Sequence, residues 1–126
     1  MIAYRPDPSF HDQVIKIAAS YITKYKVYTN PGSEKNASLG NLYPDIILTD
    51  KNTNTVVFTI EVETAESVTE SEADQWKQFS NLGGTFYLMV PQNQRAEAER
   101  ICKKYLIPVK YATYWVENGQ LKLNYE

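Results

Sequence analysis

The chain has 126 residues, of which 43% are hydrophobic and 22% are charged, and its net charge is −2 at pH 7. This length predicts a single domain, residues 1–126. No apolar segment approaches the ~20 residues that a membrane span needs, and the first ten residues lack the pattern of a secretory signal. One cysteine and one histidine exclude an internal disulfide and a zinc site built from these residues. We therefore expect a cytoplasmic protein that does not bind membranes.

Acidic residues are concentrated in one part of the chain. Residues 44–74 carry eight acidic side chains and one lysine, whereas the segments on either side are mildly basic. This distribution suits a metal site between flanks that contact phosphate groups. It also suits a domain with an acidic surface loop, and charge alone leaves both interpretations open.

The first predicted element is an amphipathic helix. Apolar residues recur at helical spacing from Phe10 to Tyr25, which predicts about four turns. Ser9 is the predicted N-cap, with Asp12 as its capping-box partner. The lone histidine, His11, lies near the start of this helix, and we interpret it as a surface residue.

A short strand over residues 26–30 is predicted next, followed by a loop that leads to a hairpin over residues 43–64. In this hairpin an apolar run, 46–48, and a β-branched run, 56–62, flank a polar turn.

Three carboxylates are expected to meet at one end of this hairpin. Side chains alternate along a strand, so Glu61 and Glu63 share a face, and Asp45 falls opposite Ile60 or Glu61. Like charges this close are costly unless a cation joins them. A hard divalent cation, which prefers oxygen ligands, is the candidate.

The second half of the chain alternates helices and strands. The pattern predicts a helix capped by Thr69 or Ser71 and ending at Gly83-Gly84, and then a central strand covered on both faces. A third helix and two strands joined by an Asn-Gly turn complete the chain; the predicted ranges are 85–90, 94–106, 109–116 and 121–125. The fold class is α/β, a mixed sheet flanked by helices in the order α-β-β-β-α-β-α-β-β.

Pro44-Asp45 followed by Glu61-x-Glu63 on the next strand resembles the motif of the PD-(D/E)xK nuclease superfamily. The element order over about residues 9–90 is similar to that of its restriction-endonuclease-like core. We expect a nuclease-like core over about 9–106 with a C-terminal hairpin over 109–125. The resemblance implies that Asp45 and Glu61 hold Mg²⁺ or Mn²⁺. In the superfamily a lysine two residues after the glutamate assists the attacking water, but this chain has Glu63 there.

A second resemblance lies in the predicted second helix. Its Gln75-Trp76-Lys77-Gln78-Phe79 is similar to the Gln-hydrophobic-x-x-Tyr motif of RecB-like members of the superfamily, which implies that Gln75 lies near the metal. Lys77 faces solvent by helix geometry and is not expected to replace the missing lysine. Lys35 lies in the loop before the site, and we expect Lys35 and Lys26 to contact nucleic acid.

These observations support a Mg²⁺-dependent endonuclease or exonuclease. Its predicted catalytic residues are Asp45, Glu61, Glu63 and Gln75, and its predicted metal ligands are Asp45, Glu61 and Glu63. Because the motif lysine is missing, a catalytically inactive module of the same fold that binds nucleic acid or a protein partner stays open. A small α/β domain unrelated to nucleases is the third alternative, and a homodimer is a further option for its assembly.

Overall fold

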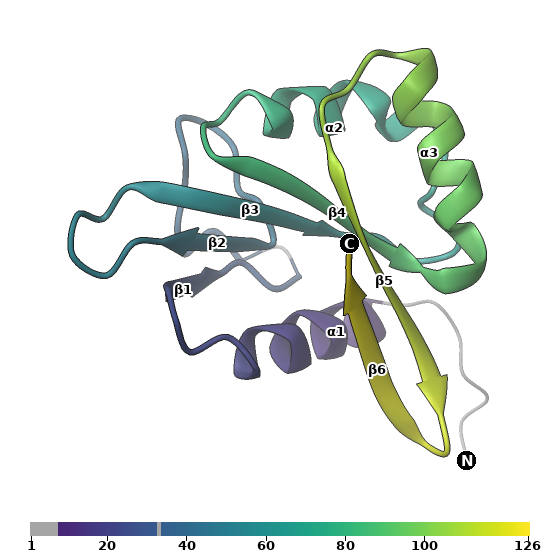
Figure 1. The fold of residues 1–126 in the computed structure, drawn as a ribbon, viewed down its shortest axis with the longest axis horizontal. Coiled ribbons are helices and arrows are strands. Elements are labelled where there is room, and N and C mark those ends of the chain that lie inside the picture. The colour runs from purple at the N-terminus through teal and green to yellow at the C-terminus, as the bar shows by residue number, and fades with distance from the viewer. Residues whose placement is uncertain (1–7, 33) are drawn as a thin grey trace.

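The computed structural model describes residues 8–32 and 34–126, which form a mixed α/β fold (Figure 1). In this part of the chain one sheet of six strands is flanked by three α-helices. The helices are α1 (Pro8–Ser20), α2 (Ala73–Ser80) and α3 (Arg95–Lys104). The strands are β1 (Lys26–Thr29), β2 (Ile46–Thr49), β3 (Val56–Val62), β4 (Thr85–Pro91), β5 (Lys110–Glu117) and β6 (Gln120–Tyr125). None of the described helices is both long and apolar enough to cross a bilayer.

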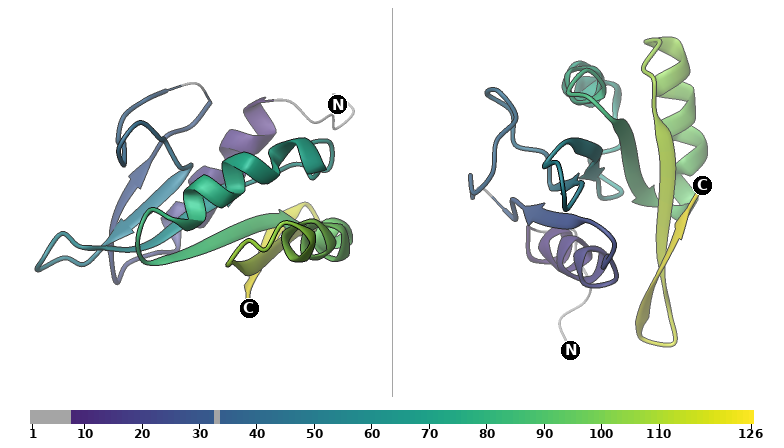
Figure 2. Two further views of the ribbon diagram at one scale, coloured as in Figure 1. Left: turned by 90° about the horizontal axis from the view of Figure 1, so that it is seen from above. Right: turned by 60° about the vertical axis from the view of Figure 1, so that its left-hand side comes forward.

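The strands lie in the sheet in their chain order, from β1 to β6. The first three pair antiparallel, β3, β4 and β5 pair parallel, and β6 returns antiparallel to β5. Parallel neighbours need a crossover connection, and α2 and α3 supply the two that this sheet requires. The sheet is strongly twisted, so its two outer strands run in very different directions (Figure 2).

Each face of the sheet has its own apolar core. α1 packs through Val14, Ile15 and Ala18 on one face, and α2 and α3 cover the other (Figure 1). The central strand β4 serves both cores, because Leu88 faces α2 and α3 while Met89 faces α1, and both are fully buried. This confirms the prediction of a strand covered on both faces. Each such side chain contributes about 1.5–3 kcal/mol when it is removed from water.

The hairpin of β2 and β3 has the register that places acidic residues together. Ile46 pairs with Ile60, so the residue before β2 lies beside the residue after Ile60. The turn is held by Asp50, whose carboxylate accepts the backbone N–H groups of Asn52 and Thr53. Asn54 follows with a positive φ of 59°. A turn with these local hydrogen bonds fixes the pairing of its strands.

The first helix differs from its prediction at both ends. It begins at Pro8, so Ser9 lies within the helix and is not its N-cap. It ends at Ser20 and not at Tyr25, because its last turn tightens into bonds from Tyr21 N–H to Ala18 and from Ile22 N–H to Ala19. The segment 21–25 therefore turns back toward the sheet.

The predicted cap of the second helix was also wrong. A single 3₁₀ turn, Glu70–Glu72, precedes α2, and no side chain caps either the turn or the helix. Thr69 and Ser71 bond to each other through their hydroxyl groups. After the helix, Gly84 has a positive φ of 68°, and a Cβ there would collide with the carbonyl oxygen of Val57. This close approach brings β4 against β3.

Candidate functional site

Asp45 and Glu61 meet where β2 begins and β3 ends. The backbone N–H of Asp45 donates to Glu61 Oε1 at 3.2 Å, and Asp45 Oδ2 accepts the backbone N–H of Val62 at 2.8 Å. Asp45 is buried and Glu61 is half-buried. Each acid is thus fixed by a backbone N–H of the neighbouring strand, and Asp45 lies beside Glu61, as the pattern of the hairpin predicts.

The environment of Glu61 disfavours its negative charge. Burial raises the pKa of the Glu61 carboxyl group well above its ordinary value, and the charges of Asp45 and Glu63 raise it further. The buried carboxylate loses the water that would solvate it, and the two neighbouring acids repel its charge. A cation placed between Asp45 and Glu61 would remove this penalty.

Glu63 is close to this pair, but its side chain is held by α2 and its main chain by β5. Its Oε2 accepts the indole N–H of Trp76 at 2.7 Å, and its main-chain oxygen accepts the hydroxyl of Tyr114 at 2.7 Å. Burial raises the pKa of the Glu63 carboxyl to about 7, although hydrogen bonds from Ser67 and Trp76 lower it. The residue at the position of the motif lysine is therefore a buried acid with a fixed orientation.

His11 is part of the site, and its interpretation as a surface residue was wrong. Its Nε2 lies 3.0 Å from Asp45 Oδ2, its Nδ1 lies 3.3 Å from Asp12 Oδ1, and its side chain is 22% exposed. Burial lowers the pKa of His11, but the hydrogen bond and charge of Asp45, together with those of Asp12, outweigh it and raise the pKa to about 9. The imidazole is thus a cation at neutral pH.

The sequence held a signal for this position of His11. His11 shares one helical stripe with Val14, Ile15 and Ala18, all of which are buried against the sheet. Asp12, predicted as a capping residue, instead accepts the backbone N–H of Gly32 and contacts His11. These two residues tie the start of α1 to the loop that precedes Asp45.

Asn30, which the sequence did not single out, organises that loop. It is 2% exposed, and its side-chain amide donates to the carbonyl oxygens of Ala37 and Pro44. Its side-chain oxygen accepts the backbone N–H groups of Asn36 and Ala37. Its own backbone N–H donates to the carbonyl oxygen of Asp45. Through these side-chain and backbone bonds Asn30 fixes the path of the loop that leads to Asp45.

The other predicted site residues lie on the surface. Gln75 is exposed on α2, and in the part of the chain that the structure describes no hydrogen bond joins it to an acid of the site. Lys35 and Lys26 are exposed, each with its ammonium over a tyrosine ring, at 5.3 Å from the centroid of Tyr43 and 5.6 Å from that of Tyr28. Lys77 is exposed, as predicted.

Two features of a complete nuclease motif are missing from the described residues. Within residues 8–32 and 34–126, no lysine is bonded to Asp45, Glu61 or Glu63. The same residues contain no group of three or more His, Cys, Asp or Glu side chains arranged to hold a metal ion. What the geometry brings together is a pair of carboxyl groups, a histidine cation and a third, separately anchored acid.

Comparison with known proteins gives no match to a family model or to a curated protein.

Proposed function

We propose that the fold is restriction-endonuclease-like and that Asp45 and Glu61 form the metal-binding centre of a nuclease. The pairing of Asp45 with Glu61 on adjacent strands carries the proposal. The order of helices and strands, with three antiparallel strands followed by a helix and a parallel strand, supports it. Both features agree with the resemblance to the PD-(D/E)xK superfamily.

The donor groups suit Mg²⁺ or Mn²⁺. Both acids offer carboxylate oxygens, the ligands that hard divalent cations prefer. Mg²⁺ commonly uses one or two carboxylates and completes its shell with water and substrate phosphate, so the two acids of this site suffice. When bound, the metal would activate water and neutralise charge on the phosphodiester.

The chain's own residues have distinct parts in this proposal. The N–H of Val62 orients the Asp45 carboxylate, and the N–H of Asp45 orients that of Glu61. His11, a cation beside Asp45, brings positive charge to a site that lacks the motif lysine. Glu63 holds its orientation through Trp76 and cannot act as an ammonium group does.

One observation favours the alternative of a non-catalytic module that binds nucleic acid or a protein. Glu63 occupies the lysine position, and Trp76 holds it there with a short hydrogen bond. A module of this kind would keep the fold and the exposed lysines Lys26 and Lys35 while lacking a competent catalytic site. Nucleic-acid binding through such lysines weakens steeply as salt rises.

Cleavage of labelled single- and double-stranded DNA and RNA with Mg²⁺ or Mn²⁺ tests the proposal. We expect Asp45→Ala and Glu61→Ala to lower cleavage by more than about a hundredfold, because each removes charge-stabilising machinery from the centre. Glu63→Lys restores the superfamily pattern and should preserve or raise cleavage. The control is Glu70→Gln, which alters an acid in the turn before α2 that pairs with Arg100 and Lys104 of α3 and makes no contact with Asp45 or Glu61 in the described hydrogen bonds and ion pairs.

Cleavage that survives Glu61→Ala would contradict the catalytic assignment. An inert wild type whose binding to labelled strands falls steeply between two salt concentrations would instead support the non-catalytic module. If neither cleavage nor salt-sensitive binding is found, nucleic acid is excluded as the partner. The remaining alternative is then a module that binds a protein.

A further inference from the structure

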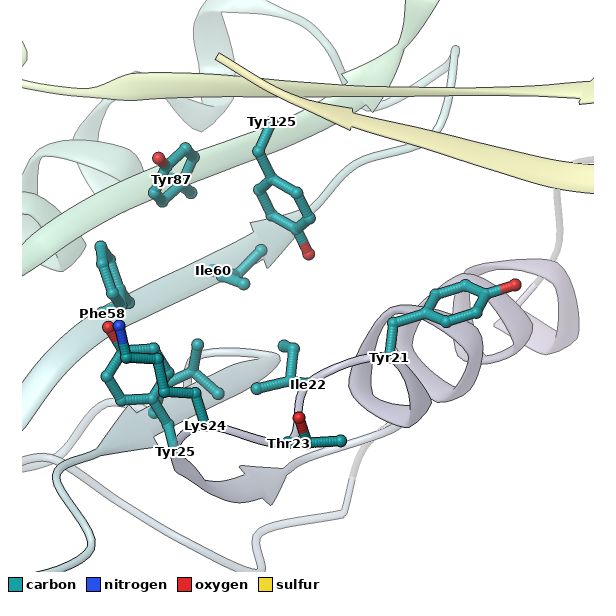
Figure 3. A pocket seen from close by; sticks show the side chains of 10 residues that line it. Tyr21, Ile22, Thr23, Lys24, Tyr25, Phe58, Ile60, Tyr87 and Tyr125 are labelled. Atoms are coloured by element: carbon teal, nitrogen blue, oxygen red, sulfur yellow. The ribbon is translucent and has the colours of Figure 1, made fainter.

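A second site lies at the other end of α1 from His11. Because α1 ends at Ser20, it leaves part of the sheet face over β3 and β4 uncovered. A pocket of about 330 Å³ fills this space, and the segment 21–25 closes one side of it (Figure 3). About 15 Å along α1 separates Tyr21 from His11 at 1.5 Å per residue, so this pocket is distinct from the group of Asp45, Glu61 and Glu63, which we call the carboxylate centre.

Aromatic rings from four separate segments line the pocket. Phe58 and Tyr87 stand side by side on the sheet, with their ring centroids 5.7 Å apart. Tyr25 meets Phe58 edge to face at 5.4 Å, and Tyr125 of β6 meets Tyr87 in the same way at 5.5 Å. Ile60 lies between them in the floor (Figure 3). Pockets of this size with aromatic walls bind small ligands, and their ring faces favour a planar aromatic group.

The polar groups at the rim are basic or neutral. Lys24 holds its ammonium 5.9 Å from the centroid of the Tyr25 ring, and Lys51 donates to the carbonyl oxygen of Thr23 at 2.8 Å. None of the ten residues that line the pocket is acidic. A cationic ligand would find no carboxylate among them and would compete with Lys24 for the ring faces, whereas an anionic group would lie near the ammonium group of Lys24. The hydroxyl groups of Thr23 and Tyr125 provide hydrogen-bonding partners for the edge of a polar ring.

We propose that this pocket binds the base and phosphate of a nucleoside monophosphate, with the base against the aromatic side chains and the phosphate near Lys24. The chemistry recognised is a planar, polar, uncharged ring joined to an anion. A free nucleotide and the 5′-phosphorylated end of a nucleic-acid strand both present it. The proposal does not depend on the nuclease proposed above, because no residue of the carboxylate centre takes part.

Calorimetric titration of the full chain with AMP, GMP, CMP and UMP tests this proposal. We expect saturable binding of at least one nucleotide, which Tyr125→Ala weakens by about tenfold through the loss of base stacking. Lys24→Gln should weaken nucleotide binding several-fold and leave binding of the matching nucleoside unchanged. Lys24 is exposed, so this variant stays informative if Tyr125→Ala fails to fold.

The matched controls are Tyr105→Ala and Lys110→Gln, which alter an exposed tyrosine and an exposed lysine outside the pocket. Glu61→Gln should also leave this affinity unchanged, which separates the pocket from the carboxylate centre. A parallel titration with a 5′-phosphorylated hexanucleotide distinguishes a strand end from a free nucleotide as the source. The proposal is overturned if none of these probes binds saturably at 10 mM, or if Tyr125→Ala and Lys24→Gln bind as tightly as the controls do.

Discussion

Two groups of carboxylates in this protein have opposite environments. On the surface near α3, Glu70 accepts hydrogen bonds from Lys104, Tyr105 and Arg100, and these lower the pKa of its carboxyl group to about 2. At the carboxylate centre, burial raises the pKa values of Glu61 and Glu63. The same type of side chain is therefore favoured as an anion in one place and disfavoured in the other.

The difference lies in the partners that surround each acid. Exposed ion pairs such as those of Glu70 contribute little to stability, because water already solvates both charges. Buried acids without basic partners lower stability, and the fold places Glu61 beside a second acid, Asp45. Acids with strongly perturbed pKa values cluster at functional sites, and this pattern supports the proposal that Asp45 and Glu61 have a chemical role.

The largest change in stability is expected from Glu63→Gln. The amide oxygen keeps an acceptor for Trp76 while the charge is lost. The folded-state pKa of Glu63 is raised from 4.5 to about 7, so the fold favours the protonated carboxyl group over the carboxylate. The stability that this preference gives is fully present below pH 4.5 and is lost as the pH rises through 7. With chelator present, Glu63→Gln should gain up to about 3 kcal/mol over the wild type at pH 8 and nothing at pH 4. Urea unfolding at both pH values measures this, and an equal difference at the two would contradict it.

Divalent metal should give the next largest effect. A ligand present at about 100 times its Kd adds ~2.7 kcal/mol to the free energy of unfolding. We expect Mn²⁺ or Mg²⁺ to raise the melting temperature of the wild type and to have little effect on Glu61→Gln. If millimolar metal leaves the melting temperature of both proteins unchanged, the claim that Asp45 and Glu61 bind a divalent cation is contradicted.

His11→Asn should have a somewhat smaller effect with the opposite sign. Because the folded-state pKa of His11 is raised from 6.5 to about 9, the bond to Asp45 stabilises the fold fully below pH 6.5 and is lost as the pH rises through 9. The histidine is partly exposed, so we expect a loss of about 2 kcal/mol at pH 6 that disappears near pH 10. Urea unfolding across this pH range, with chelator present, measures the difference in the free energy of unfolding. A difference that does not depend on pH would show that His11 acts only through packing.

The smallest effect is expected at the surface. Glu70→Gln removes the ion pairs with Arg100 and Lys104, which lie in water, and should change the free energy of unfolding least of the four changes. Urea unfolding in low and high salt measures this change. If Glu70→Gln changes the free energy of unfolding as much as Glu63→Gln does, the contrast between exposed and buried acids is wrong.

The sequence predicted the strands better than the ends of the helices. The alternation over residues 56–62 and the polar turn before it were enough to place Asp45 beside Glu61, because the register of a hairpin is a local property. The end of α1 was not predicted, since the apolar spacing continues to Tyr25 although the helix stops at Ser20. The residues after Ser20 pack against the sheet, and spacing alone does not distinguish this from a longer helix.

The third partner of the site could not be predicted from local pattern. The bond between His11 and Asp45 joins residues 34 positions apart, and it requires the angle at which α1 crosses the sheet. The hydrogen bond from Trp76 to Glu63 depends in the same way on the docking of α2. The pattern of a strand shows which face an acid occupies, and it does not show which helix supplies the neighbouring group.

Direct titration of Mn²⁺ into the metal-free protein tests the central claim that Asp45 and Glu61 hold a divalent cation. We predict that one Mn²⁺ binds per chain, that Asp45→Asn and Glu61→Gln each weaken binding by more than about tenfold, and that Glu70→Gln leaves it unchanged. No saturable binding at millimolar Mn²⁺, or equal binding in Glu61→Gln and the wild type, would contradict the account.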